Sequence, residues 1–434
     1  MKDSVISVSK SSPEKSQEEN TTSTEYAPSE IDAVEYPEGG LCAWMVVLGS
    51  FLVYFASFGI INSFGTFQEF YIRDYLSNYS ATAIAFIGSL QITLLYIMGI
   101  IIGPIFDAKG FKYLYPIGVL GSVASLIALS FTRPNKIWQQ FLSQGILFGI
   151  SVSFGYYPAL SIVGHYFNRR RALAMGIVAA GSSVGGVCLP IMFSRLFGTI
   201  GFAWSVRVAA LITLFCYSIT MLISRTRLPP KPFKGLTSIV DFGGFMDPRY
   251  SVLSIGCVLV NLGLYSPYYY IEPFAVQYGV PDSVHPYLLS IINGLSFFGR
   301  ILGSQLADRY GRLNVLCPAT LISGILCLAL WFPSTSAAPL IIFACVYGIF
   351  ISVFSAAVGQ LSPVDKLGAR IGTFFLPTAV ATLVGTPIGG AFVKTGAKDE
   401  YHHIAIFAGV MIVSGSVLLF VSRLLCSRDI KAKW

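Results

Sequence analysis

The stretch GPIFDAKGFK (residues 103–112) directly follows a long apolar run, and SQLADRYGRL (residues 304–313) repeats its plan later in the chain. In both stretches a small residue stands four positions before an Asp, a Gly follows the Asp by three positions, and a cation comes after the Gly. The two Asp residues, Asp107 and Asp308, fall between apolar segments at corresponding places in the chain. A repeated polar connection in a hydrophobic sequence indicates two halves of similar fold.

The composition is that of a polytopic membrane protein. Of the 434 residues, 54% are hydrophobic and 12% charged, with a mean hydropathy of +0.69; soluble domains carry about 25% charged residues. Residues 1–38 are the exception, because they are rich in Ser, Thr and Glu and too polar to bury a core. We expect them to form a disordered cytoplasmic tail, and they contain no pattern of a cleaved signal peptide.

Apolar windows predict an all-α protein with twelve transmembrane helices. A helix needs about 20 apolar residues to cross a bilayer, and such windows fall near 42–66, 82–102, 113–131, 137–160, 172–195, 202–223, 251–275, 286–307, 315–332, 339–359, 370–393 and 403–424. They divide into two pseudo-symmetric six-helix halves, residues 39–223 and 251–425. Residues 224–250 are expected to be a cytoplasmic linker and 426–434 a short cytoplasmic tail.

A second repeated motif supports the two halves. GSSVGG (residues 181–186) and GTPIGG (residues 385–390) lie in the fifth and eleventh expected spans. Small residues four positions apart let helix backbones approach closely in lipid. We therefore expect Gly181/Gly185 and Gly385/Gly389 to lie at helix–helix contacts.

The distribution of Lys and Arg predicts the orientation. Most of these 29 cations fall in the two tails and in the loops of one side, which is the cytoplasmic side by the positive-inside rule. Both termini are then cytoplasmic, and the net charge of +8 needs no nucleic-acid partner to explain it. The sequon at Asn78 falls in the first outer loop, where it could be glycosylated.

The repeated connections resemble the inner-loop signature of the major facilitator superfamily, Gly-x-Leu-Ala-Asp-Arg-x-Gly-Arg-Lys. The second copy keeps Leu306, Ala307, Asp308, Arg309, Gly311 and Arg312; the first keeps Gly103, Asp107, Gly110 and Lys112 but has Ala108 and Phe111 where Arg is expected. The resemblance implies a cytoplasmic gate in which an Asp at a helix end pairs with a cation. Asp107 and Lys112 would form its weaker half, and Asp308, Arg309 and Arg312 its stronger half.

Two further stretches resemble the monocarboxylate transporters, and in particular their fungal members. These stretches are YFNRRRALAMGIVAAGSSVG (residues 166–185) and EGGLCAW (residues 38–44). In that family the Arg matching Arg300 receives the substrate carboxylate, which a planar guanidinium can bind through two hydrogen bonds. The alternative is that Arg300 supports the gate at Asp308. Insertion of an Arg near mid-membrane costs about 2.5–3.5 kcal/mol, so a cavity or a partner is expected for it.

The expected substrate site is neutral and aromatic apart from Arg300. Proton-coupled members of the resembled family carry an Asp where this chain has Ser296, and a Lys in the first span where it offers only Asn62. The further candidate binding residues near mid-membrane are Gln91, Asn261, Tyr265, Asn293 and Phe297, each with packing as the alternative. Glu272 is the one carboxylate placed to accept a proton near the outer side, or else it caps or anchors a helix end.

The sequence therefore predicts a secondary active or facilitative transporter that moves a small organic solute, a carboxylate or other organic anion, with symport of a proton left open. The alternatives are an exporter of a natural product, a carrier of a vitamin-like aromatic solute, and a non-transporting nutrient sensor on the same fold. Nothing in the sequence indicates an enzyme, a cofactor, a metal or a required protein partner. The plasma membrane is expected, with the vacuolar membrane as the alternative.

Overall fold

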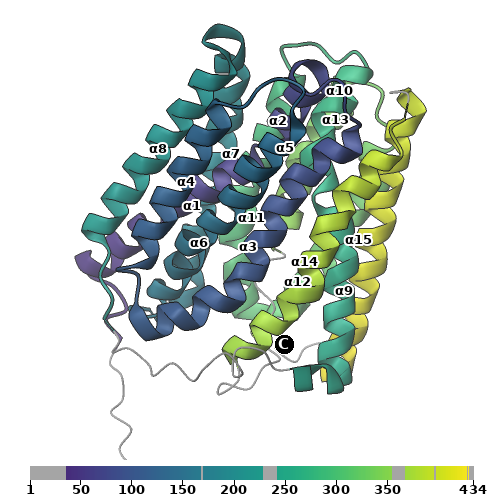
Figure 1. The fold of residues 1–434 in the computed structure, drawn as a ribbon. Helices are drawn as coiled ribbons and strands as arrows, with labels where there is room; N and C mark the ends of the chain where they lie inside the picture. The colour runs from purple at the N-terminus through teal and green to yellow at the C-terminus, as the bar shows by residue number, and fades with distance from the viewer. Residues whose placement is uncertain are drawn as a thin grey trace, which may run out of the picture. The chain divides into compact units, whose positions relative to one another are not determined.

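Every regular element in the described part of the chain is a helix (Figure 1). The computed structural model describes residues 36–167, 170–227, 242–353, 367–394, 397–427 and 429. Within these ranges nine helical segments are long and apolar enough to cross a membrane, and two shorter apolar helices accompany them, α4 (Leu114–Ser130) and α13 (Ala337–Ile351). The helix that carries Arg300, α11 (Leu288–Tyr310), completes the twelve spans predicted from hydropathy.

Several spans consist of more than one helical segment. The spans of the first half are α1 (Leu41–Asn62) with α2 (Phe64–Phe70) and η1 (Tyr71–Tyr75), α3 (Ala81–Lys109), α4, α5 (Ile137–Gln140) with η2 (Phe141–Phe148) and α6 (Gly149–Val163), α7 (Arg171–Thr199), and α8 (Gly201–Ile223). Those of the second half are α9 (Pro248–Leu264) with α10 (Ser266–Gln277), α11, α12 (Arg312–Leu326) with η6 (Cys327–Trp331), α13, α14 (Leu367–Ala391), and α15 (Lys398–Cys426). The short helices η4 (Phe242–Met246) and η5 (His285–Tyr287) precede α9 and α11.

The first and seventh spans are interrupted at corresponding places. Ser63 separates α1 from α2, and its hydroxyl donates a hydrogen bond of 2.7 Å to the Gly59 carbonyl. Tyr265 separates α9 from α10, where Pro267 has no N–H to continue the helical ladder. Close by, the carbonyl of Leu264 accepts a hydrogen bond of 2.8 Å from the Tyr347 hydroxyl. Asn62 and Tyr265, both candidate binding residues, therefore lie at the two interruptions.

The repeated connections have the same backbone conformation. Gly110 ends α3 with φ = 68° and Gly311 ends α11 with φ = 99°. Each donates its N–H to a carbonyl of the last helical turn, Phe106 O and Ala307 O respectively. Because residues that carry a side chain rarely adopt a positive φ, glycine is the residue that ends a helix this way without strain. The Gly three positions after each Asp is thus a helix terminator.

Small residues bring helices of the same half together, as the spacing predicts, except at Gly389, where a Cβ atom would meet only side chains, at 3.4 Å. A Cβ atom on Gly181 or Gly185 of α7 would lie 2.3 Å from the carbonyl oxygen of Phe51 or Phe55 of α1. A Cβ atom on Gly385 of α14 would lie 2.4 Å from the Leu262 oxygen of α9. The first and fifth spans, and the seventh and eleventh, are therefore packed backbone to backbone in related ways.

The last Gly of each repeated motif faces the opposite half. A Cβ atom on Gly186 would lie 2.4 Å from Asn293 Cγ in α11, and one on Gly390 would lie 2.9 Å from the Thr82 nitrogen in α3. α3 and α14 run beside each other in Figure 1, and Ser89 and Thr386 are hydrogen-bonded between them. The repeat seen in the sequence therefore also supplies contacts between the two halves.

Most differences from the expected boundaries are small. The first span continues through Tyr75, beyond the expected window, because Gln68, Glu69 and Arg73 lower the hydropathy without ending the helix. Glu38, expected in the disordered tail, is hydrogen-bonded through its backbone to Tyr166 O and through its carboxylate to Arg170 N. The remainder of that tail up to residue 35, most of the linker at 228–241, and residues 430–434 lie outside the described residues.

Candidate functional site

Arg300 lies on α11 where this helix packs against α7 of the first half. Its Nη1 donates a hydrogen bond of 3.3 Å to the carbonyl of Ala179, whereas its buried Nε has no partner. Among the described residues no carboxylate forms an ion pair with it. The half-buried guanidinium therefore retains capacity to bind an anion.

Tyrosine hydroxyl groups from both halves lie within the electrostatic field of Arg300. They belong to Tyr54 of α1, Tyr96 of α3, Tyr156 of α6 and Tyr268 of α10. We call these four residues, together with Tyr265, the tyrosine cluster. Sequence reasoning identified only Tyr265 among them. The signal was present in the doublet Tyr156–Tyr157 and the triplet Tyr268–Tyr270, which place polar hydroxyls inside apolar spans.

Hydrogen bonding and stacking hold the cluster together across the two halves. The hydroxyls of Tyr96 and Tyr265 lie 3.1 Å apart. The rings of Tyr54 and Tyr156 stack with centroids 4.6 Å apart, and Tyr96 stacks on Phe375 of α14 at 5.4 Å. Flat aromatic faces beside a cation can accept both the conjugated body and the charged group of an organic anion.

Two polar pairs connect α11 with the first half on the side of the cluster nearer η5. Asn62 Nδ2 donates to Asn293 Oδ1 at 3.2 Å, and Asn293 in turn donates to the Leu289 carbonyl. Ser183 and Ser296 are joined through their hydroxyls at 2.7 Å. Ser296 is thus engaged in a neutral hydrogen bond between the halves.

Three other candidate binding residues make no described contact with the tyrosine cluster. Asn261 is buried and donates to the Cys257 carbonyl of its own helix at 2.8 Å. Gln91 is fully buried, its backbone packs against Gly149, and its amide has no hydrogen-bond partner among the described residues. Phe297 is half-buried and packs edge-on against Phe298. Their role in binding stays a prediction.

The candidate gate residues lie at the helix ends where the signature places them. Asp107 is exposed in the last turn of α3, and Lys112 is exposed in the connection that follows. Arg309 is exposed and lies 5.4 Å from the ring centre of Tyr310, and Arg312 is exposed at the start of α12. The side chain of Asp308 lies outside the described part of the chain, so its pairing stays a prediction.

Asn78 lies in an exposed turn between η1 and α3. The Ser80 hydroxyl of its sequon accepts a hydrogen bond of 3.3 Å from Ala83 N and so caps α3. The position is compatible with a glycan, and its modification remains a prediction.

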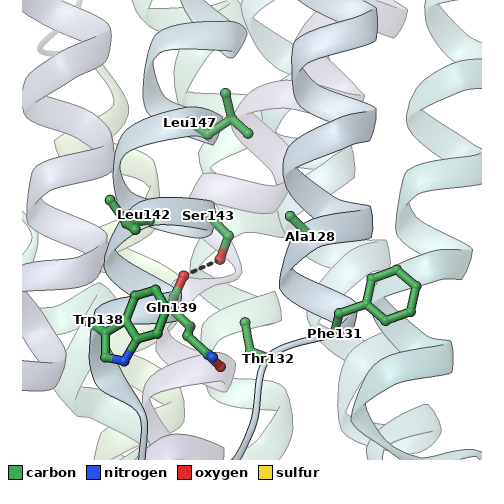
Figure 2. A pocket seen from close by; sticks show the side chains of 8 residues that line it. All are labelled: Ala128, Phe131, Thr132, Trp138, Gln139, Leu142, Ser143 and Leu147. Atoms are coloured by element: carbon green, nitrogen blue, oxygen red, sulfur yellow. Dashed lines mark hydrogen bonds between the residues drawn. The ribbon is translucent and has the colours of Figure 1, made fainter.

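A pocket of about 380 Å³ opens elsewhere, between α4 and the span formed by α5 and η2 (Figure 2). Phe131, Trp138 and Leu142 line it and each exposes more than half of its surface. Its polar lining consists of Thr132, Gln139 and Ser143, and the Ser143 hydroxyl donates to the Gln139 carbonyl at 2.7 Å. This pocket lies within one half, its apolar lining is exposed at the surface, and no charged residue lines it. It therefore does not resemble a site for an anion between two halves.

Comparison with known proteins identifies relatives over most of the chain. A family model described as Major Facilitator Superfamily matches residues 41–352 and again residues 287–430. The MFS transporter asaE of Aspergillus flavus is 37% identical over 392 residues, which cover 89% of this chain and 88% of that protein. The aspyridones efflux protein apdF of Emericella nidulans is 36% identical, covering 92% and 81%, and the fujikurins efflux protein of Gibberella fujikuroi is 38% identical, covering 90% and 84%.

Solved structures of similar fold are also transporters. The nucleoside transporter NupG superposes with a TM-score of 0.65 at 15% identity, covering 89% of this chain and 100% of that one. The peptide transporter POT in complex with sulfate superposes with a TM-score of 0.68 at 13% identity, covering 92% and 98%. At these identities the likeness concerns the fold.

Proposed function

Because this chain belongs to the major facilitator superfamily of multi-pass membrane transporters, we propose that it exports a small organic anion with an aromatic or conjugated body. Arg300 binds the acidic group of this solute, and the tyrosine cluster receives its flat body. Transport proceeds by alternating access, in which the two halves rock around a site between them. The observation that carries the proposal is the environment of the Arg300 guanidinium. It lies near tyrosines from both halves, and no described carboxylate neutralises its charge.

The direction of transport is inferred from the relatives. Two of those described above are named as efflux proteins for aspyridones and for fujikurins, and a third, from Paecilomyces divaricatus, as an efflux protein for agnestins at 35% identity. These names support the exporter of a natural product more than the uptake of a simple carboxylate. From the resemblance to monocarboxylate transporters we retain only one feature, the binding of an acidic group by Arg300.

Several assignments accompany this proposal. The half boundaries near residues 39–223 and 251–425, the cytoplasmic termini and a glycan on Asn78 follow from the sequence pattern. Export to the medium favours the plasma membrane, and sequestration in the vacuole is the alternative. Asp107, Lys112, Asp308, Arg309 and Arg312 form the cytoplasmic gate.

A metabolite comparison tests the proposal even while the solute is unidentified. The gene is deleted from its own organism, and metabolites of cells and medium are compared with those of the parent. We expect an acidic aromatic metabolite to accumulate in cells and to decline in the medium. Reintroduced wild type and Lys136→Gln, which changes an exposed cation outside the proposed site and gate, should restore its release, whereas Arg300→Gln should not. If only a neutral solute is retained, or if Arg300→Gln restores release, the proposal is wrong.

A further inference from the structure

The two halves touch at the end of the bundle that carries the loops at residues 76–80 and 278–284, which the charge pattern predicts to be the outer end. There α2 packs against α10: a Cβ atom on Gly65 would lie 2.3 Å from the Tyr268 carbonyl oxygen. Arg195 of α7 also donates to the Tyr287 hydroxyl of the second half at 2.5 Å. We call the contact of α2 with α10 the outer seam. It must separate when the transporter opens to the outside.

A carboxyl group is buried within the outer seam. Glu272 of α10 is 4% exposed, and its Oε2 has no hydrogen-bond partner among the described residues. Thr66 of α2 lies beside it, and the buried Thr66 hydroxyl has no other hydrogen-bond partner among the described residues. Burying a carboxyl group costs less free energy when it is protonated than when it is ionised, unless hydrogen bonds or a cation compensate the charge.

A second carboxyl group approaches from the opposite half. Glu69 lies one helical turn after Thr66 on α2, so the two residues share a face, and it interacts electrostatically with Glu272. Two like charges at one partly buried site cannot both remain ionised without cost. Closing the seam brings the two carboxyl groups together, and opening it lets water reach both.

The neighbouring cation does not neutralise this pair. Arg73 of η1 lies within electrostatic range of both Glu69 and Glu272, but it forms an ion pair of 2.9 Å with Asp74 and its side chain is 64% exposed. Tyr401 of α15 also lies within electrostatic range of Glu69, but it contributes a hydroxyl group and no positive charge. Arg73 is therefore committed to neither Glu69 nor Glu272.

His285 connects the buried carboxyl group with the surface. Its Nδ1 lies 3.9 Å from Glu272 Oε1, and its Nε2 lies 3.1 Å from Oδ1 of Asp282, whose side chain is fully exposed. The Glu272 and Asp282 carboxyl groups raise the pKa of the His285 imidazole. An imidazole with one nitrogen toward each carboxyl group can pass a proton from solvent to the buried one.

We propose that Glu69 and Glu272 form a proton-binding site in the outer seam, and that the seam closes only when a proton is bound there. A proton from the outer solution passes by way of His285 to the Glu272 carboxylate, and opening of the seam returns it to that solution. Acid outside therefore favours the closed seam. By linkage, the ratio of open to closed transporter rises about tenfold per pH unit for each proton taken up on closing.

The test measures the opening of the seam and needs no transported solute. Spin labels are placed through non-canonical amino acids at Asn78 and Lys394, exposed positions of the two halves, and the eight native cysteines are kept. Distances between labels are measured in lipid nanodiscs at about pH 5 and about pH 8, on either side of the midpoint expected for such a group. We expect short distances at the lower pH and a population of longer distances at the higher pH.

Variants separate a proton site from a merely structural carboxyl group. Glu272→Gln mimics the protonated form and should give short distances at both pH values, and Glu69→Gln should move the midpoint to higher pH. Asp399→Asn, which changes an exposed carboxylate at the start of α15, should keep the opening at high pH. Sodium added at constant pH should have no effect, which distinguishes a proton from a metal cation as the bound species.

Three results would overturn the proposal. They are distances in the wild type that do not depend on pH, a Glu272→Gln protein that opens at high pH as the wild type does, and closure driven by sodium. Size-exclusion chromatography confirms that each variant is folded. Since the measurement concerns only the seam, a negative result leaves the export of an organic anion untouched, and failure to export such an anion leaves the proton site untouched.

Discussion

The hydroxyl groups of Tyr96 and Tyr265 lie 3.1 Å apart and join the two halves of the transporter beside Arg300. Each comes from a different half, and Tyr265 stands at the interruption between α9 and α10. When the two halves rock against each other, this hydrogen bond must break, or the two tyrosines must move together. The pair is therefore both a wall of the proposed site and a link between the moving parts.

Removal of either hydroxyl should weaken the contact between the halves. A neutral hydrogen bond contributes about 0.5–1.5 kcal/mol, so Tyr96→Phe and Tyr265→Phe should each lower the free energy of unfolding by about that amount. The double variant should cost no more than the larger single effect, because both changes remove the same bond. Unfolding in detergent, followed by tryptophan fluorescence, measures this coupling. Additive losses would show that the two hydroxyls act separately.

The packing of α7 against α1 should not tolerate a methyl group at Gly185. A Cβ atom there would lie 2.3 Å from the Phe55 carbonyl oxygen and 2.8 Å from Gly59 Cα, both backbone atoms that cannot turn aside. We expect Gly185→Ala to cost about 1–3 kcal/mol of stability, as overpacking does. Gly198→Ala is the matched control, because it lies on the same helix with no atom within 4 Å of its Cβ position. Equal thermal stability of the two variants would contradict the close approach.

His285 should stabilise the protein in acid but not in alkali. Its pKa is raised first by Glu272 and then by Asp282, so the protonated imidazole contributes stability that is complete below its unfolded pKa and is lost as the pH rises through the folded one. His285→Gln should therefore unfold at a lower temperature than the wild type at about pH 5 and at the same temperature at about pH 9. A larger difference at the alkaline end would reverse the sign of the interaction.

The two Asp residues of the repeated connections should differ in importance. Ala108 and Phe111 replace the expected Arg residues of the first connection, whereas Arg309 and Arg312 remain in the second. Asp308→Asn should abolish release of the retained metabolite or allow it to leak, and Asp107→Asn should have a milder effect. Export assays on both variants at matched expression decide the matter. Equal loss would mean that the first connection contributes as much as the second.

The repeated fold was predictable from the sequence because single residue types determine it. Apolar length predicts the twelve spans, and Gly110 and Gly311 mark helix ends because their positive φ excludes other residues. Gly185 and Gly186 identify contact faces for the same steric reason. Hydropathy could not place the end of the first span near Tyr75, because Glu69 and Arg73 are polar yet remain helical.

The site was less predictable because it depends on which faces of distant helices meet. Arg300 is a candidate from the sequence because an Arg inside a membrane span costs free energy unless it faces a cavity or a partner. Asn62 and Asn293 are candidates because they are polar, but only the structure shows that they are hydrogen-bonded to each other. Tyr54 and Tyr96 give no such signal, because a single tyrosine in an apolar span packs as well against lipid as against a partner. Asn261, by contrast, donates its amide to its own helix.

The central claim is that Arg300 binds the acidic group of the exported solute, and the affinity of purified protein for the metabolite retained in the deletion strain tests it most directly. Calorimetric titration of wild type, Arg300→Lys, Arg300→Gln and the control Lys136→Gln gives the four dissociation constants. Loss of a charge-assisted hydrogen bond is worth about 1.5–3 kcal/mol, or roughly 10- to 150-fold in affinity. We expect a loss in that range for Arg300→Lys, a larger loss for Arg300→Gln, and none for Lys136→Gln. Wild-type affinity in a folded Arg300→Gln protein would contradict the claim.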